Sequence, residues 1–155
     1  MRNILYTCLF LFCCFSMTGK VPSKQKIRLT ENWEYLKGDL GGIWEAVRPA
    51  SPGNPETVPV WQKVTLPHCF NAEDAVDPDV NYYQGPGWYK TLLTVDNPYA
   101  DGRIVLDFEG AGQKTKVYIY TTLVGEHVGG YDEWSVDITE AVNSFMADDQ
   151  LMKRF

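Results

Sequence analysis

The sequence predicts an all-β sandwich. Short segments in which apolar and polar residues alternate recur about every ten residues, and glycine, proline, asparagine or aspartate residues separate them. Alternation with a period of two places every second side chain on one face of a strand. A chain of 155 residues with 45% hydrophobic content is long enough to bury a core in one domain.

The chain before residue 110 contains the earlier strands of this sandwich. The expected strands are residues 27–37, 60–66, 88–95 and 103–109. A kink is expected near Asn32 in the first of them. Prolines between Pro49 and Pro59 exclude a helix or a central strand there. Residues 66–87 show no sustained periodicity, and long ordered loops of this kind are usually functional.

The clearest pattern lies in residues 116–142. Val117 and Ile119 alternate with tyrosines, and the chain returns after Thr121 and Thr122, which predicts a β-hairpin. Residues 134–138 alternate again and predict the next strand. Thr139 is expected to be the N-cap of a short helix that ends near Phe145.

Two adjacent glycines, Gly129 and Gly130, separate the hairpin from the last expected strand. Glycine adopts backbone angles that other residues resist. We therefore expect a sharp bend, with at least one of the two glycines at positive φ, that presents Tyr131, Asp132 and Glu133.

The amino-terminal residues have the pattern of an export signal. Arg2 precedes an apolar run that ends at Met17, which is too short to cross a membrane comfortably. We expect a signal peptide over residues 1–19, a polar linker over 20–26 and the folded domain over 27–155. The expected location is secreted or periplasmic, with a lipid anchor as the alternative, and no membrane span is expected.

Cysteine content and charge restrict the chemistry further. Cys8, Cys13 and Cys14 lie in the apolar run, so Cys69 alone remains, and we expect it to be a buried apolar residue. The net charge of −6, with no basic stripe, makes nucleic acid an unfavourable partner.

Short motifs along the chain resemble those of one family of enzymes. The motifs are Leu66-Pro67-His68, Gly87-Trp88-Tyr89, Val117-Tyr118-Ile119, Val124-Gly125-Glu126-His127, Gly129-Gly130-Tyr131 and Asp137-Ile138-Thr139. In this order and spacing they resemble the amino-terminal sugar-binding domain of glycoside hydrolase family 2, which includes β-galactosidases, β-glucuronidases and β-mannosidases. The resemblance implies a jelly-roll, galactose-binding-like β-sandwich.

The resemblance also implies which domain of the parent enzyme carries out catalysis. The two catalytic glutamates of the family lie in a barrel domain, so we expect no catalytic residue in this chain, no cofactor and no activity from the chain alone. The expected partners are a β-glycoside, first of all a β-galactoside, and the immunoglobulin-like and barrel domains of the family. Further strands follow in the family, so the sandwich is expected to be incomplete after Phe155, with unpaired sheet edges.

Loops of this domain in the family can reach the sugar, which implies candidate contacts in two places. The matching segments are residues 68–71 and 131–133, and the candidate substrate-binding residues are His68, Asn71, Tyr131 and Asp132. An aromatic ring offers an apolar face to a pyranose, while a carboxylate or an amide bonds its hydroxyls. Turn formation and packing are the competing interpretation for all four residues.

Other polar groups have simpler interpretations. His68 and His127 are too few for a metal site, which needs three or four ligands, so we expect both to make structural hydrogen bonds. The carboxylates of Glu73-Asp74, Asp77, Asp79 and Asp132-Glu133 are expected to be solvated. Two other functions stay open, namely a stand-alone carbohydrate-binding module and a scaffold for protein contacts.

Overall fold

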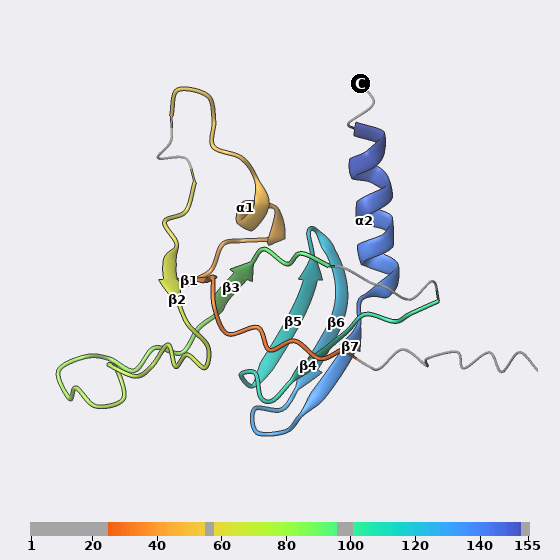
Figure 1. Cartoon of the computed structure of the whole chain (residues 1–155). Helices are drawn as coiled ribbons and strands as arrows, with labels where there is room; N and C mark the ends of the chain where they lie inside the picture. The colour runs from red at the N-terminus through yellow and green to blue at the C-terminus, as the bar shows by residue number, and fades with distance from the viewer. Residues whose placement is uncertain (1–24, 55–57, 96–100, 153–155) are drawn as a thin grey trace, which may run out of the picture.

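The structure is a computed structural model that describes residues 25–54, 58–95 and 101–152. The described residues form seven strands and two helices (Figure 1). In order, these are β1 (Trp33–Lys37), α1 (Ile43–Val47), β2 (Gln62–Val64), β3 (Gly87–Thr91), β4 (Val105–Phe108), β5 (Lys114–Ile119), β6 (Thr122–Val128), β7 (Trp134–Asp137) and α2 (Thr139–Met152). The expected signal peptide lies outside the described residues, as does the expected linker up to residue 24.

All strand pairs are antiparallel, and they form three small sheets. The first has the order β2-β1-β3, the second pairs β4 with β7, and the third is the β5–β6 hairpin. In Figure 1 the three-stranded sheet lies to the left, and the two smaller sheets lie beside helix α2. Strands dominate the architecture, which confirms the expected all-β sandwich.

The β5–β6 hairpin packs face to face on the β4–β7 pair. A Cβ atom added to Gly125 of β6 would lie 2.7 Å from Cγ2 of Val136 in β7, so the two layers meet where there is no side chain. Beside this contact, the His127 ring stacks on Trp134 at 4.8 Å and Trp134 stacks on Phe108 at 4.4 Å between ring centroids. These three residues form a ring stack that joins both sheets.

The hairpin turn uses a residue that is unusual for its conformation. Tyr120 has a φ of 54°, in the left-handed region that normally favours glycine or asparagine. Its ring contacts Phe145 of α2 at 5.4 Å between centroids. The contact with α2 offsets part of the cost of the turn. The expected kink at Asn32 is confirmed as well, since its φ is 62°.

Buried apolar side chains lie in two places. Tyr35 of β1 is 4% exposed. Ile138, immediately before α2, is 0% exposed, and Val142 in the first turn of α2 is 7% exposed. Two exposed ion pairs join the segment before β1 to β4, namely Lys26 with Asp107 at 3.8 Å and Arg28 with Glu109. The three-stranded sheet and the remaining two sheets therefore have separate clusters of buried residues.

The structure differs from the sequence prediction at both helices. Helix α2 continues to Met152 instead of ending near Phe145, because residues 146–152 contain no glycine or proline and include good helix formers. Thr139 is the first helical residue and does not act as the cap. Its hydroxyl accepts the N–H of Ile104 at 2.8 Å, and the carboxylate of Asp137 accepts the Thr139 N–H at 2.9 Å.

Helix α1 was not expected, and the expected strands are shorter in the structure. The N–H of Arg48 bonds the carbonyl of Trp44 at 2.8 Å and closes the single turn of α1. Arg48 itself is extended, as a residue before proline prefers to be, so the helix ends there. The second expected strand shortens to the three residues of β2.

Candidate functional site

The longest described loop connects β2 to β3 and comprises residues 65–86, called here the β2–β3 loop. Its first part is attached where the Leu66 N–H bonds the Thr30 carbonyl at 2.8 Å. Its last part is attached where the Gly38 N–H bonds the Pro86 carbonyl at 3.1 Å. Thr30 and Gly38 lie on either side of β1, so the loop begins and ends against the two ends of the same strand.

A cluster of rings packs this loop onto the sheet. Tyr35 of β1 contacts His68 at 5.0 Å, Phe70 at 6.0 Å and Tyr89 at 4.8 Å between ring centroids. Nδ1 of His68 lies 2.8 Å from the hydroxyl of Tyr89. The buried hydroxyl of Tyr35 has no hydrogen-bond partner among the described residues. His68 therefore acts as a packed and hydrogen-bonded residue, as the sequence predicted for it.

Burial of these rings changes the acidity of two tyrosines. Removal from water raises the pKa of Tyr35 to about 12, and the neighbouring Tyr83 and Asp74 add to the effect. Burial likewise raises the pKa of Tyr89 to about 12, with a smaller contribution from Tyr35. Both phenols are therefore held in the neutral form.

The carboxylate of Asp74 is the polar centre of the loop. Nζ of Lys37 donates to its two oxygens at 2.9 and 2.6 Å, Nδ2 of Asn71 donates at 3.0 Å, and the Tyr83 N–H donates at 3.2 Å. The hydrogen bond from Lys37 is the main reason that the pKa of Asp74 lies below its ordinary value. Three separate segments of the chain thus meet at one side chain.

Two expectations about this loop are wrong. Asp74 is not solvated, because its side chain is only 7% exposed and its charge is balanced by Lys37. Cys69 is not buried but exposed, since the ring that packs inward at this point belongs to its neighbour Phe70. The other acidic residues of the loop, Glu73, Asp77 and Asp79, are exposed as expected.

Asn71 is engaged within the loop. It is 8% exposed, and its Nδ2 atom donates both to Asp74 and to the carbonyl of Tyr83 at 3.1 Å. Both donor hydrogens of the amide therefore have internal partners. This arrangement fits the turn-forming interpretation of Asn71 better than a free donor to a ligand.

The second candidate segment is the β6–β7 loop, residues 129–133. Gly129 has a φ of 152°, which confirms the expected bend. Tyr131 is fully exposed, and the side chain of Asp132 is 57% exposed. An oxygen of Asp132 lies 3.1 Å from Nε2 of His127, yet this nitrogen has no hydrogen-bond partner among the described residues. The hydrogen bond expected for His127 is therefore not formed at that atom within this part of the chain.

The structure does not bring the four candidate residues together through direct contacts. Among the described residues, no hydrogen bond, ion pair or ring contact joins His68 or Asn71 to Tyr131 or Asp132. The first two are anchored to the three-stranded sheet and the last two follow the hairpin. In Figure 1 the β2–β3 loop and the β6–β7 loop both lie at the lower side of the molecule, on different sheets.

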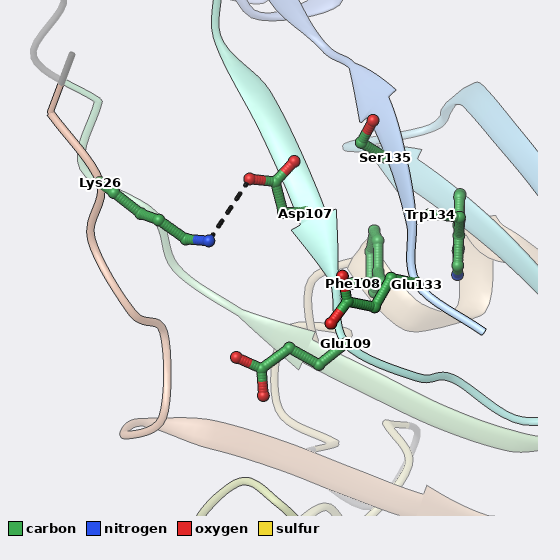
Figure 2. A pocket seen from close by; sticks show the side chains of 7 residues that line it. All are labelled: Lys26, Asp107, Phe108, Glu109, Glu133, Trp134 and Ser135. Atoms are coloured by element: carbon green, nitrogen blue, oxygen red, sulfur yellow. Dashed lines mark ion pairs between the residues drawn. The ribbon is translucent and has the colours of Figure 1, made fainter. Parts of the chain in front are cut away.

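A shallow pocket of about 320 Å³ lies along the β4–β7 pair (Figure 2). Its lining residues are Lys26, Asp107, Phe108, Glu109, Glu133, Trp134 and Ser135. Three carboxylates face one lysine, whose Nζ lies 3.8 Å from Asp107. The pocket therefore has an excess of negative charge and is unfavourable for an anionic ligand.

The part of the chain that the structure describes has neither a metal-binding cluster nor a membrane-spanning helix. No group of three or more histidine, cysteine or acidic residues there is arranged to hold a metal ion. No helix within the same residues is long and apolar enough to cross a membrane.

Sequence reasoning missed the importance of Lys37 and Asp74. The only available signal was the alternation of the first strand, which places Lys37 on the same face as the buried Tyr35. A lysine on a buried face needs a counter-charge, and the loop that follows β2 is rich in carboxylates.

The comparison with protein families identifies the sandwich. Residues 18–148 match the model of the sugar-binding domain of glycosyl hydrolases family 2. The chain belongs to this family. The match covers more than half of the chain and includes both candidate loops.

Known relatives support the same assignment. The structure is similar to the crystal structure of a β-glucuronidase from Parabacteroides merdae, with a TM-score of 0.75, 77% identity and coverage of 82% of this chain and 17% of that one. A putative β-glucuronidase of Formosa agariphila is 33% identical over 79% of this chain and 14% of its own length. A β-galactosidase of Thermoanaerobacter pseudethanolicus is 31% identical over 72% of this chain and 14% of its own.

The chain thus spans only a small part of the length of these relatives, between 14% and 17%. The part that it matches is the sugar-binding sandwich.

Proposed function

We propose that this chain is the amino-terminal, non-catalytic sandwich of a family 2 glycoside hydrolase that removes β-glucuronic acid residues. The observation that carries this proposal is the 77% identity to the P. merdae β-glucuronidase, against 31% to the T. pseudethanolicus β-galactosidase. The proposal moves the expected sugar from a β-galactoside to a β-glucuronide. Both sugars remain within the range of the family.

In this proposal the chemistry takes place outside the sandwich. A retaining glycosidase needs two carboxyl groups about 5 Å apart, one as nucleophile and one as acid/base. The family supplies them from its barrel, so the sandwich would shape the entrance to the active site. The most buried carboxylate of the β2–β3 loop, Asp74, is already committed to Lys37 and is a poor candidate for either role.

Tyr131 and Asp132 are our proposed sugar contacts within the sandwich. The fully exposed ring of Tyr131 offers an apolar face, and the exposed carboxylate of Asp132 accepts hydrogen bonds from hydroxyls. Asp132 would repel the carboxylate of glucuronic acid and so would face its hydroxyls. His68 and Asn71 would act indirectly, by giving the β2–β3 loop its shape.

Kinetics with two chromogenic substrates test the proposal. A protein in which this chain is followed by a catalytic barrel should hydrolyse nitrophenyl β-D-glucuronide with a kcat/KM at least about 100-fold above that for the β-D-galactoside. Residues 20–155 alone, as the control, should release no nitrophenol from either substrate. A preference for the galactoside would contradict the proposed sugar, and turnover by residues 20–155 that a carboxylate substitution abolishes would contradict the non-catalytic role.

We also infer that residues 1–19 direct export. The positively charged start and the apolar run support this inference. Amino-terminal sequencing of the mature protein should place the first residue close to Lys20. An intact Met1 would contradict export by cleavage, and incorporation of labelled fatty acid would favour the lipid anchor.

A further inference from the structure

One charged side chain connects the middle of the β2–β3 loop, residues 71–83, to β1. The Asp74 carboxylate accepts hydrogen bonds from Lys37 in β1, from Asn71 before it and from the Tyr83 N–H after it. Asn71 also bonds the carbonyl of Tyr83 at 3.1 Å, which closes the same group of residues. Among the described residues, Lys37 alone makes a polar contact between this carboxylate and the sheet, so the position of residues 71–83 depends on the Lys37–Asp74 pair.

The position of this carboxylate makes its hydrogen bonds strong. The side chain of Asp74 is 7% exposed, so water competes little for its oxygens. Charge-assisted hydrogen bonds are about twice as strong as neutral ones. Nζ of Lys37 also lies 5.0 Å from the centre of the Tyr83 ring and so contacts both the carboxylate and the far side of the loop.

We propose that Asp74 and Lys37 form a latch that fixes residues 71–83 of the β2–β3 loop on β1, and that Asp74 is a positioning residue for Asn71. The latch acts through hydrogen bonds to the loop and not through contact with a ligand. Its first part rests on the geometry alone. Its second part, an effect on substrate, rests on the proposed function.

The same sheet contains a control for the latch, an ion pair whose lysine matches Lys37 in exposure. Glu34, also in β1, pairs with Lys90 of β3 at 3.4 Å and lies on the opposite face of the strand. The two lysines have the same exposure, 37% of each side chain. No hydrogen bond or ion pair joins Glu34 or Lys90 to residues 66–86 among the residues described. Loss of the Glu34 charge therefore removes an ion pair of β1 without changing the loop.

Hydrogen exchange of the full chain tests the latch. The reporters are the N–H groups of Ala75 and Asp77, which bond Asn71 and Glu73 within the loop at 2.9 and 3.2 Å, and the β1–β3 ladder is the internal reference. In Asp74→Asn the reporters should exchange about tenfold faster or more, while the ladder changes little. Lys37→Met should act in the same way, Lys37→Arg should retain most of the protection, and Glu34→Gln should match the unmodified chain.

The outcomes separate the latch from a merely structural ion pair. Unchanged reporters in both Asp74→Asn and Lys37→Met would overturn the proposal, as would equal acceleration in Glu34→Gln. If Asp74→Asn does not fold, Lys37→Met provides the test of the latch. This variant should fold, because Lys37 is partly exposed and methionine keeps the aliphatic part of its side chain. Acceleration of the reporters and the ladder together would show general unfolding and would also overturn the latch.

Kinetics separate the positioning role from the proposed function. In a protein that includes the catalytic barrel, Asp74→Asn should raise the KM for nitrophenyl β-D-glucuronide about tenfold with kcat nearly unchanged, and Lys37→Arg should restore most of the KM. Faster loop exchange with an unchanged KM would overturn the positioning role. A preference of the unmodified protein for the galactoside would overturn the proposed sugar, and the exchange experiment would still decide the latch.

Discussion

Substitution of Gly129 by alanine tests the bend of the β6–β7 loop. Gly129 has a φ of 152°, where an L-residue is strained by about 1–3 kcal/mol. A new Cβ would also meet Oδ1 of Asp132 and lie 2.9 Å from Nε2 of His127. Asp132 is exposed and can turn away, whereas the His127 ring is held by its stack on Trp134. Backbone strain and the collision with the fixed His127 ring are therefore both expected to contribute to the cost.

The expected loss of 1–3 kcal/mol corresponds to a Tm lower by roughly 4–12 °C. Thermal melting followed by circular dichroism measures it in the full chain. Gly42→Ala is the matched control, because Gly42 is extended, with a φ of 171°, and a Cβ there would have no atom within 4 Å. The control should change stability by less than about 0.5 kcal/mol.

A double substitution separates the collision with Asp132 from backbone strain and the contact with His127. Asp132→Ala alone should cost less than about 0.5 kcal/mol, as at an ordinary surface site. Added to Gly129→Ala, it removes the contact with Asp132 but leaves φ and the contact with His127 unchanged, so little stability should return. A Gly129→Ala protein that melts like the unmodified chain would refute the strained bend. Full recovery in the double variant would show that collision, and not φ, sets the cost.

Three further outcomes are expected. Ile138→Ala should lower the free energy of unfolding by about 2–5 kcal/mol in urea denaturation, because Ile138 is 0% exposed; a loss below 1 kcal/mol would contradict a packed site. Alkaline titration followed by absorbance at 295 nm should show Tyr35 and Tyr89 ionising near pH 12. Because their pKa values are raised from 10.0, the stability that these two tyrosines contribute is complete below pH 10 and is lost as the pH rises to about 12. Hydrogen bonds from the Thr139 hydroxyl and N–H, and then from Arg103, lower the pKa of Asp137 from 3.8 to about 2. The contribution of Asp137 to stability is therefore present above pH 3.8 and is lost as the pH falls to about 2. An NMR titration midpoint near 3.8 would contradict these bonds.

Local patterns explain which parts of the fold could be predicted. The hairpin around Val117 and Ile119 follows from alternation within a few residues, and the bend at Gly129 follows from the backbone freedom of glycine. The length of α2 was underestimated because helix propensity is a weak signal, and residues 146–152 show no further pattern that marks them as helical.

The polar centre of the β2–β3 loop could not be predicted in the same way. Lys37 and Asp74 lie 37 positions apart, and only the folded chain brings them within 2.6 Å. In sequence, Asp74 is one of several acidic residues of a loop, and most of these are exposed. Burial of a single member of such a set depends on long-range packing of Phe70 and Tyr83 around it, which periodicity does not encode.

The links between the segment before β1 and β4 have a consequence for the response to salt. The pairs Lys26–Asp107 and Arg28–Glu109 lie at the surface, with side chains between 45% and 73% exposed. Surface charges interact through water, and at 1 M salt the screening length falls to about 3 Å. Each exposed pair contributes at most about 1 kcal/mol. Concentrated salt would therefore weaken the attachment of residues 26–28 to β4 by a small amount and leave the buried residues of both parts unchanged.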